Sequence, residues 1–141
     1  MPTCTLLFVC RPLFAHPISK TTIESSPLMV TPEQRRDLIA KIRQLPTQLR
    51  TLVNDLTAEQ LTTPYLPAEW TVAQNIHHLA DAHMHSFILF KLMLSEEKPA
   101  LKGYSPDAWA NMADANHADL EPSLHLLTGL HARWAQLLES L

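Results

Sequence analysis

The sequence predicts an all-α protein, built as an antiparallel bundle of amphipathic helices. Apolar residues recur at spacings of three and four along three long segments, which is the period of a helix with one buried face. Residue patterns that start helices stand before each of these segments. Apolar residues make up 46% of the 141 positions and only two are glycine, a balance typical of one folded globular domain.

The first long helix is expected to begin after Thr31, which forms a capping box with Gln34 and is followed by a proline. Pro46 lies within this helix and removes one backbone hydrogen bond, so we expect either a kink near it or two helices that meet there. A second capping box at residues 57–60 predicts a short helical turn. The apolar stripe of the first helix is Leu38, Ile42, Leu45, Leu49, Leu52 and Leu56.

Two further long helices follow. One is expected from Thr71 to about Glu97, and the other opens at Pro122, with a short helix from Ser105 to about Ala113 between them. Three amphipathic helices pack most simply as an up-down bundle. The predicted core faces of the two helices are Val72, Ile76, Leu79, His83, Phe87, Phe90 and Leu94 in one, and Leu124, Leu127, Leu130 or His131, and Trp134 in the other.

Composition excludes several classes of protein. The net charge is −3 and no stripe of lysine and arginine exists, so no nucleic-acid partner is expected. No run of about 18 apolar residues occurs, so no membrane-spanning helix is expected. The two cysteines, Cys4 and Cys10, lie close together at the N-terminus, which argues against a disulfide framework and favours a cytoplasmic location.

Residues 1–30 differ from the rest of the chain, because they contain four prolines and show no helical period. Their apolar run, residues 6–10, is too short for the core of a signal peptide. We expect a disordered leader or a misassigned upstream start, since Met29 stands immediately before the first helix signal; a signal peptide is the alternative. The folded domain is expected to cover residues 31–141.

Four histidines crowd into residues 77–85, and His78, Asp81 and His85 share roughly one helix face. Imidazole is the commonest protein ligand of transition metals, and nearby carboxylates often orient it. However, His78 and His85 are about 10 Å apart along a helix axis, too far to share one zinc ion. No His-x-x-x-His pair occurs, so the sequence offers one good ligand at most. The alternative is that these histidines are partly buried polar residues of a helix face.

The other aromatic residues and histidines give weaker evidence for a functional role. The three tryptophans are interpreted as packing anchors, and Trp70 is expected to fix the entry into the second long helix. Tyr104 could line a pocket or lie on the surface, and His131 could face the bundle core. No glycine-rich phosphate loop and no serine or cysteine nucleophile motif is present.

The segment 67–81, Pro-Ala-Glu-Trp-Thr-Val-Ala-Gln-Asn-Ile-His-His-Leu-Ala-Asp, resembles the W-[ST]-V-x-x-x-x-x-H-[LI]-x-[DH] element of the DinB/YfiT-like superfamily. The resemblance continues through residues 83–92, 98–99, 102–104, 107–109 and 130–134, and covers about residues 30–141. It implies a four-helix bundle of up-down-down-up type. It also implies a cytoplasmic, often dimeric, metal-dependent hydrolase that binds one zinc or nickel ion through three histidines.

By this resemblance, His78 is the first metal ligand. From their positions in the sequence, we expect five further residues to surround the ligand or to line the pocket: His77, Asp81, His85, Tyr104 and His131. The other two ligands come from a late helix with a His-x-x-x-His pair. That pair is absent here, so we expect the last helix to be missing and the metal site to be incomplete. The expected function is hydrolysis of a small molecule, impaired by truncation. A thiol-dependent S-transferase of the same superfamily and a non-catalytic helical dimerisation module are the alternatives.

Overall fold

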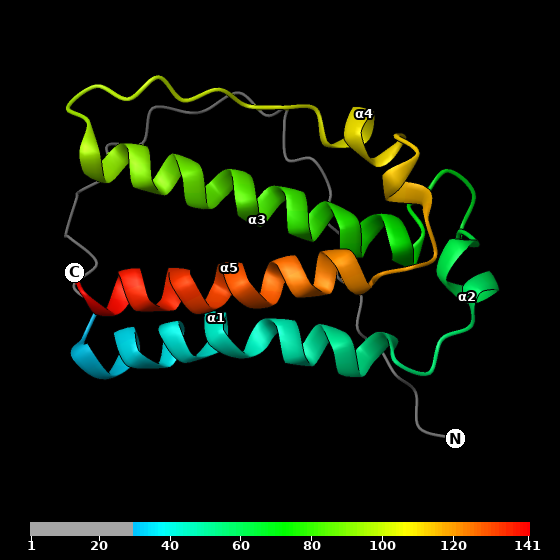
Figure 1. The fold of residues 1–141 in the computed structure, drawn as a ribbon, viewed down its shortest axis with the longest axis horizontal. Coiled ribbons are helices and arrows are strands. Elements are labelled where there is room, and N and C mark those ends of the chain that lie inside the picture. Colours follow the sequence, from blue (N-terminus) through cyan, green and yellow to red (C-terminus); the bar gives the residue numbers. More distant parts are fainter. Residues whose placement is uncertain (1–29) are drawn as a thin grey trace, which may run out of the picture.

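The computed structural model describes residues 30–141, and within them every regular element is a helix. This confirms the all-α prediction for that part of the chain. The predicted leader, the start at Met29 and the two cysteines lie outside the described residues. The elements are α1 (Pro32–Val53), α2 (Ala58–Thr62), α3 (Val72–Ser95), α4 (Pro106–Ala110), a 3-10 turn (Asp114–Asn116) and α5 (Glu121–Glu139) (Figure 1).

Helix α5 lies between α1 and α3 and packs against both (Figure 1). Helices α1 and α3 run in opposite directions, as expected for neighbours in a bundle. The extended segment of residues 96–105 then runs back along α3, so that α5 is parallel to α3 (Figure 1). The order of directions is therefore up-down-down, as the family resemblance implied, and does not alternate. Among residues 30–141, no helix has both the length and the apolar character needed to cross a bilayer.

Three capping boxes of the form Thr-x-x-Gln begin α1, α2 and α3. In each, the threonine hydroxyl accepts from the glutamine backbone N–H and the glutamine side chain accepts from the threonine N–H, at 2.8–3.2 Å. These contacts confirm the predicted helix starts. The box of α3 differs from the other two because Thr71 and Gln74 are buried, and the Gln74 amide also donates to the carbonyl of Ala110 at 2.8 Å. This bond ties α4 to the first turn of α3.

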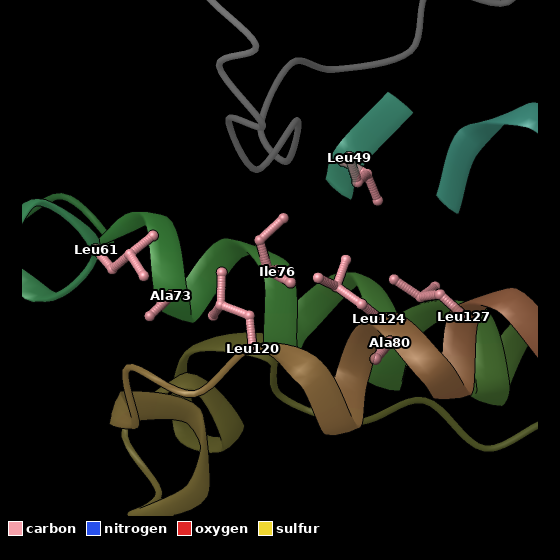
Figure 2. Packing of buried hydrophobic residues seen from close by; sticks show 8 residues of the cluster. All are labelled: Leu49, Leu61, Ala73, Ile76, Ala80, Leu120, Leu124 and Leu127. Carbon is pink, nitrogen blue, oxygen red and sulfur yellow. The ribbon is translucent and has the colours of Figure 1, made fainter. Parts of the chain in front are cut away.

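Apolar side chains of all three long helices meet in one core (Figure 2). Ala73 and Leu127 are completely buried, and the small side chains of Ala73 and Ala80 let α5 approach α3 closely. The predicted core faces of α3 and α5 are confirmed at Ile76, Phe87, Leu124 and Leu127. The core residues drawn in Figure 2 are Leu49, Leu61, Ala73, Ile76, Ala80, Leu120, Leu124 and Leu127.

The predicted stripe of α1 is partly wrong. Leu38 and Leu52 are 50% and 67% exposed, whereas Ile39, Pro46 and Leu49 are buried. The reason is that α1 packs mainly on one neighbour, α5, which covers only a narrow face of the helix. The short helix predicted up to Ala113 also ends earlier, at Ala110, and a 3-10 turn follows it.

Helix α1 continues through Pro46, so the expectation of two helices meeting there is wrong. Proline has no N–H, which leaves the carbonyl of Ile42 without its helical donor. His131 of α5, only 2% exposed, supplies the donor: its Nδ1–H donates to that carbonyl at 2.6 Å. Its Nε2 then accepts from Nδ1–H of His83 at 2.8 Å. This pair of histidines joins α1, α3 and α5, and it confirms that His131 faces the core.

Candidate functional site

The first two turns of α3 carry the candidate metal ligand. Two sets of hydrogen bonds hold this part of the helix in place. The buried capping box of Thr71 and Gln74 sets the start of the helix, and the bond from Gln74 to Ala110 holds α4 beside it. Trp70 stands immediately before the cap. These contacts place α4 and the end of the returning segment over the N-terminal half of α3, where His78 lies (Figure 1).

His78 is half-buried between aromatic rings. The Trp70 ring meets the imidazole edge-on, with centroids 4.9 Å apart, and the Tyr104 ring lies at 6.4 Å. The Nδ1 atom of His78 is buried and has no hydrogen-bond partner among the described residues. An unsatisfied buried polar atom costs about 1–3 kcal/mol, so it indicates a site that a ligand would complete. Every other buried side-chain nitrogen or oxygen of residues 30–141 has a hydrogen-bond partner.

Carboxylates surround the same imidazole. Burial lowers the pKa of His78, and Asp81 and Asp107 oppose that effect. The pKa of Asp81 is raised, first by burial and then by the charge of Asp114, while protonated His78 and His77 would lower it. The neutral imidazole is the form that binds metals, and the neighbouring negative charges attract a cation.

Tyr104 joins the outer part of the site. Its ring lies 5.1 Å from that of His85 and 4.2 Å from that of Trp109, and burial, with Asp81 second, raises the pKa of its hydroxyl. The Nε2–H of His85 donates to the carbonyl of Lys102 at 2.7 Å, which ties α3 to the returning segment. We call this group the His78 cluster; it comprises Trp70, His78, Asp81, His85, Tyr104 and Trp109.

The structure brings four of the six predicted site residues together, namely His78, Asp81, His85 and Tyr104. His77 is buried on the neighbouring face of α3, where Nε2–H donates to the carbonyl of His117 at 2.9 Å and Nδ1 accepts from the hydroxyl of Ser123 at 2.7 Å. Both of its nitrogens are therefore engaged in hydrogen bonds away from the cluster. His131 lies elsewhere, against α1.

Sequence reasoning treated Trp70 and Trp109 as packing anchors and did not single out Asp107 or Asp114. The structure adds all four to the surroundings of His78. For Trp70 a signal existed, because it stands eight residues before His78, or about two helical turns. The other three lie on α4 and the 3-10 turn, which the bonds from Gln74 to Ala110 and from His77 to His117 help to hold against α3.

Among residues 30–141, no three His, Cys, Asp or Glu side chains lie close enough together to hold a metal ion. His78 fits one donor position, and the described residues do not supply a complete set. What the cluster offers is one neutral, half-buried imidazole, a negative environment and an aromatic wall. That combination suits one side of a cation-binding pocket.

The structure is a helical bundle with a half-buried histidine among aromatic rings and carboxylates, and the sequence profile of the DinB superfamily matches residues 41–141. The chain belongs to the DinB superfamily. It is 51% identical over 116 residues to a protein of Geobacillus thermodenitrificans named "Putative metal-dependent hydrolase". It is 45% identical over 112 residues to "Putative metal-dependent hydrolase YfiT" of Bacillus subtilis. These alignments cover 82% and 79% of this chain.

A solved structure shows the same fold. YfiT from Bacillus subtilis, described as "a probable metal-dependent hydrolase with an unusual four-helix bundle topology", superposes with a TM-score of 0.76 at 39% identity. The match covers 92% of this chain and 70% of that one. The alignments cover only 60–65% of the length of the first three curated relatives, so the chain spans less than two thirds of each.

Proposed function

We propose that this protein is a metal-dependent hydrolase of the DinB superfamily in which His78 is a metal ligand. The orphaned, buried Nδ1 atom of His78 is the observation that carries the proposal. The names of the relatives support it, and so do the carboxylates around the imidazole. Imidazole suits both zinc and nickel, and we propose one such ion per chain.

Catalytic zinc sites use three protein ligands and keep one position for water. The donors that complete a site with His78 therefore have to come from outside the described residues or from a second chain. A bound ion would supply a water molecule of lowered pKa for attack on a small electrophilic substrate. Until those donors join it, we expect His78 alone to hold a divalent ion only weakly.

The residues around His78 have separate proposed roles. Asp81 lies one turn after His78 on α3 and holds negative charge beside the cation position. The rings of Trp70, Tyr104 and Trp109 exclude water from one side of the pocket and so strengthen electrostatic interactions within it. His85, fixed by the carbonyl of Lys102, positions Tyr104.

Because His78 alone is expected to hold the ion weakly, the metal assignment is tested by dialysing the purified protein to equilibrium against an excess of zinc or nickel and measuring the metal that it binds. We expect His78→Ala to bind less metal than the wild type under the same conditions. His125→Ala is the matched control, because the His125 side chain is 73% exposed and pairs with Glu121 at 3.5 Å. Equal metal in wild type and His78→Ala would remove His78 from the site.

The alternatives differ in measurable ways. Turnover of a small ester or amide without added thiol supports a hydrolase, and turnover only with thiol supports an S-transferase of the same superfamily. A non-catalytic helical module would bind no metal and would form homodimers, which sedimentation detects. We also propose a cytoplasmic location, in keeping with the metal-dependent enzyme.

A further inference from the structure

A groove separate from the His78 cluster runs between α3 and α5, with a volume of about 520 Å³. Met84 and Ile88 of α3 and Leu126 of α5 line it and are 37%, 52% and 40% exposed. Phe87, which is buried, forms part of its floor. Gly129 also lines the groove, and apart from its chain neighbours and the backbone of its own helix, no atom of the described residues lies within 4 Å of where its Cβ would be. The groove therefore presents accessible apolar surface, with open space beside α5 at Gly129.

The parallel direction of α3 and α5 gives this groove two different ends (Figure 1). His83 bonds to His131, and the Arg133 guanidinium lies over Phe87, so each residue of α3 is level with the residue of α5 about 46–48 positions later. Leu126 therefore lies at one end of the groove, and Met84 lies nearer its middle. Seven residues further along each helix, about 10 Å by helical rise, stand Lys91 and Arg133. Had the helices been antiparallel, each end would carry one cation. Instead, Leu126 and Gly129 form an apolar end, and Arg133 and then Lys91 follow towards the other end.

The two cations have no acidic partner within residues 30–141. Lys91 and Arg133 both lie over the Phe87 ring, at 5.6 Å and 5.7 Å from its centre, and neither forms an ion pair with a described residue. Aspartate and glutamate are absent from the groove lining. By contrast, Arg43 and Arg50 on the α1 side are paired with glutamates of α5. The groove thus combines uncompensated positive charge with apolar surface.

We propose that this groove binds a medium-chain fatty carboxylate, with the head group between Lys91 and Arg133 and the chain along Met84, Leu130 and Leu126. A polar head at one end and an apolar tail of about 10 Å match the distribution of charge and apolar surface. A second copy of the chain fits less well, because groove-to-groove pairing offers no carboxylate to either cation. The inference does not depend on the metal proposal, since the two sites share no residue.

The test uses protein labelled with ¹³C at the methionine methyl groups. We expect decanoate, below the concentration at which it forms micelles, to shift the Met84 methyl resonance in a saturable way. Met112, which lies outside the groove in the loop after α4, is the internal reference and should not shift. Decyltrimethylammonium and 1-decanol have the same chain length without the negative charge, and we expect each to bind about tenfold more weakly.

Variants separate the head-group contacts from the tail contacts. Lys91→Gln and Arg133→Gln should each weaken decanoate binding about two- to fivefold, as for exposed charge pairs, while Lys41→Gln on α1 should leave it unchanged. Gly129→Leu should abolish binding by filling the open space, whereas Gly129→Ala should retain it, and neither meets a neighbouring atom at Cβ. Equal binding of the cationic amphiphile, unchanged binding in Gly129→Leu, or a Met84 shift caused by self-association would each overturn the proposal.

Discussion

Two residues on different helices, Pro46 of α1 and His131 of α5, depend on each other through the carbonyl of Ile42. Pro46 removes the donor that the Ile42 carbonyl would have inside α1, and His131 replaces it from α5. The carbonyl therefore has its donor only while the histidine is present. An alanine at position 46 would supply an N–H from the helix itself and make the histidine dispensable for this purpose.

This dependence predicts a non-additive double-mutant cycle. His131→Leu in the wild-type background should lower the free energy of unfolding by about 1–3 kcal/mol, because it leaves a buried carbonyl unsatisfied. In the Pro46→Ala background the same change should cost at least about 1 kcal/mol less. Urea unfolding of the four proteins measures both values. Additive effects would show that the carbonyl of Ile42 gains its partner elsewhere.

The partner of His131, His83, makes stability depend on pH. Burial, followed by the charges of protonated His131 and His78, lowers the pKa of His83 from 6.5 to about 4. Between these two values the unfolded chain binds more protons than the folded chain, so stability falls as pH falls through this window. Above about pH 6.5 the contribution is fully present.

We expect His83→Gln to flatten the decline in unfolding free energy between about pH 6.5 and about pH 4. Glutamine is chosen because its amide can still donate to His131, so the change removes the titration and retains a donor. His125→Gln, at an exposed position, is the control and should leave the slope as in the wild type. Urea midpoints measured across the window provide the comparison, and an unchanged slope in His83→Gln would assign the decline to another group.

At the scale of elements, the three capping boxes offer a natural comparison, because the same Thr-x-x-Gln pattern occurs in different surroundings. Gln34 is exposed, whereas Gln74 is buried and also bonds to Ala110. We expect Gln34→Ala to cost about 0.5–1 kcal/mol and Gln74→Ala about 1–3 kcal/mol, since the latter also removes a buried hydrogen bond to the carbonyl of Ala110 and leaves the Asn116 amide as its remaining donor. Thermal or urea unfolding measures the difference.

Gln74→Ala has a second expected consequence, which a loss of capping alone would not produce. Without the bond to Ala110, α4 should separate from α3 and carry Trp109 away from Tyr104. Amide exchange in residues 106–110 should therefore speed up relative to the end of α3. Similar exchange in Gln34→Ala and Gln74→Ala would show that α4 is held by apolar contacts instead.

Local signals were sufficient to predict the helices. A cap, an apolar stripe and a breaking proline define α3 within two residues of its observed end, because all three act over one or two turns. The face of α1 was less predictable. Leu38 and Leu52 fit the helical period as well as Ile39 does, and only the position of α5 decides which residues are covered. The continuity of α1 through Pro46 likewise depends on a donor 85 residues away in the chain, His131.

At the scale of the whole molecule, part of the candidate site could be predicted from local sequence patterns, and part depends on how distant segments pack together. His78, Asp81 and His85 share one helix, so their spacing alone placed them near one another. The contribution of Trp109, Asp107 and the 3-10 turn depends on the path of residues 96–105 back along α3, which no local pattern specifies. The resemblance to the DinB superfamily supplied the up-down-down order that composition and periodicity left open.

The relative strength of the forces that hold α1 on α5 gives the last prediction. Two ion pairs join these helices, Arg43 with Glu139 at 2.6 Å and Arg50 with Glu121 at 2.5 Å, and all four side chains are 40–53% exposed. Exposed pairs contribute about 0.2–1 kcal/mol each, and salt screens them. Leu127, which is completely buried on α5, should cost about 2–5 kcal/mol when changed to alanine.

We therefore expect Arg43→Gln and Arg50→Gln each to lower the free energy of unfolding by less than about 1 kcal/mol. At high salt, which already screens the ion pairs, both substitutions should have a smaller effect on this free energy. Leu127→Ala should destabilise the protein more than both charge changes together, because it leaves a cavity in the apolar core that α1 shares with α3 and α5. Urea unfolding at low and high salt compares the three variants. If the arginine variants cost more than Leu127→Ala, the two ion pairs, and not the apolar core, would hold α1 in place. Charge would then set the position of α1 on α5, and this would explain why Leu38 and Leu52 of that helix are exposed.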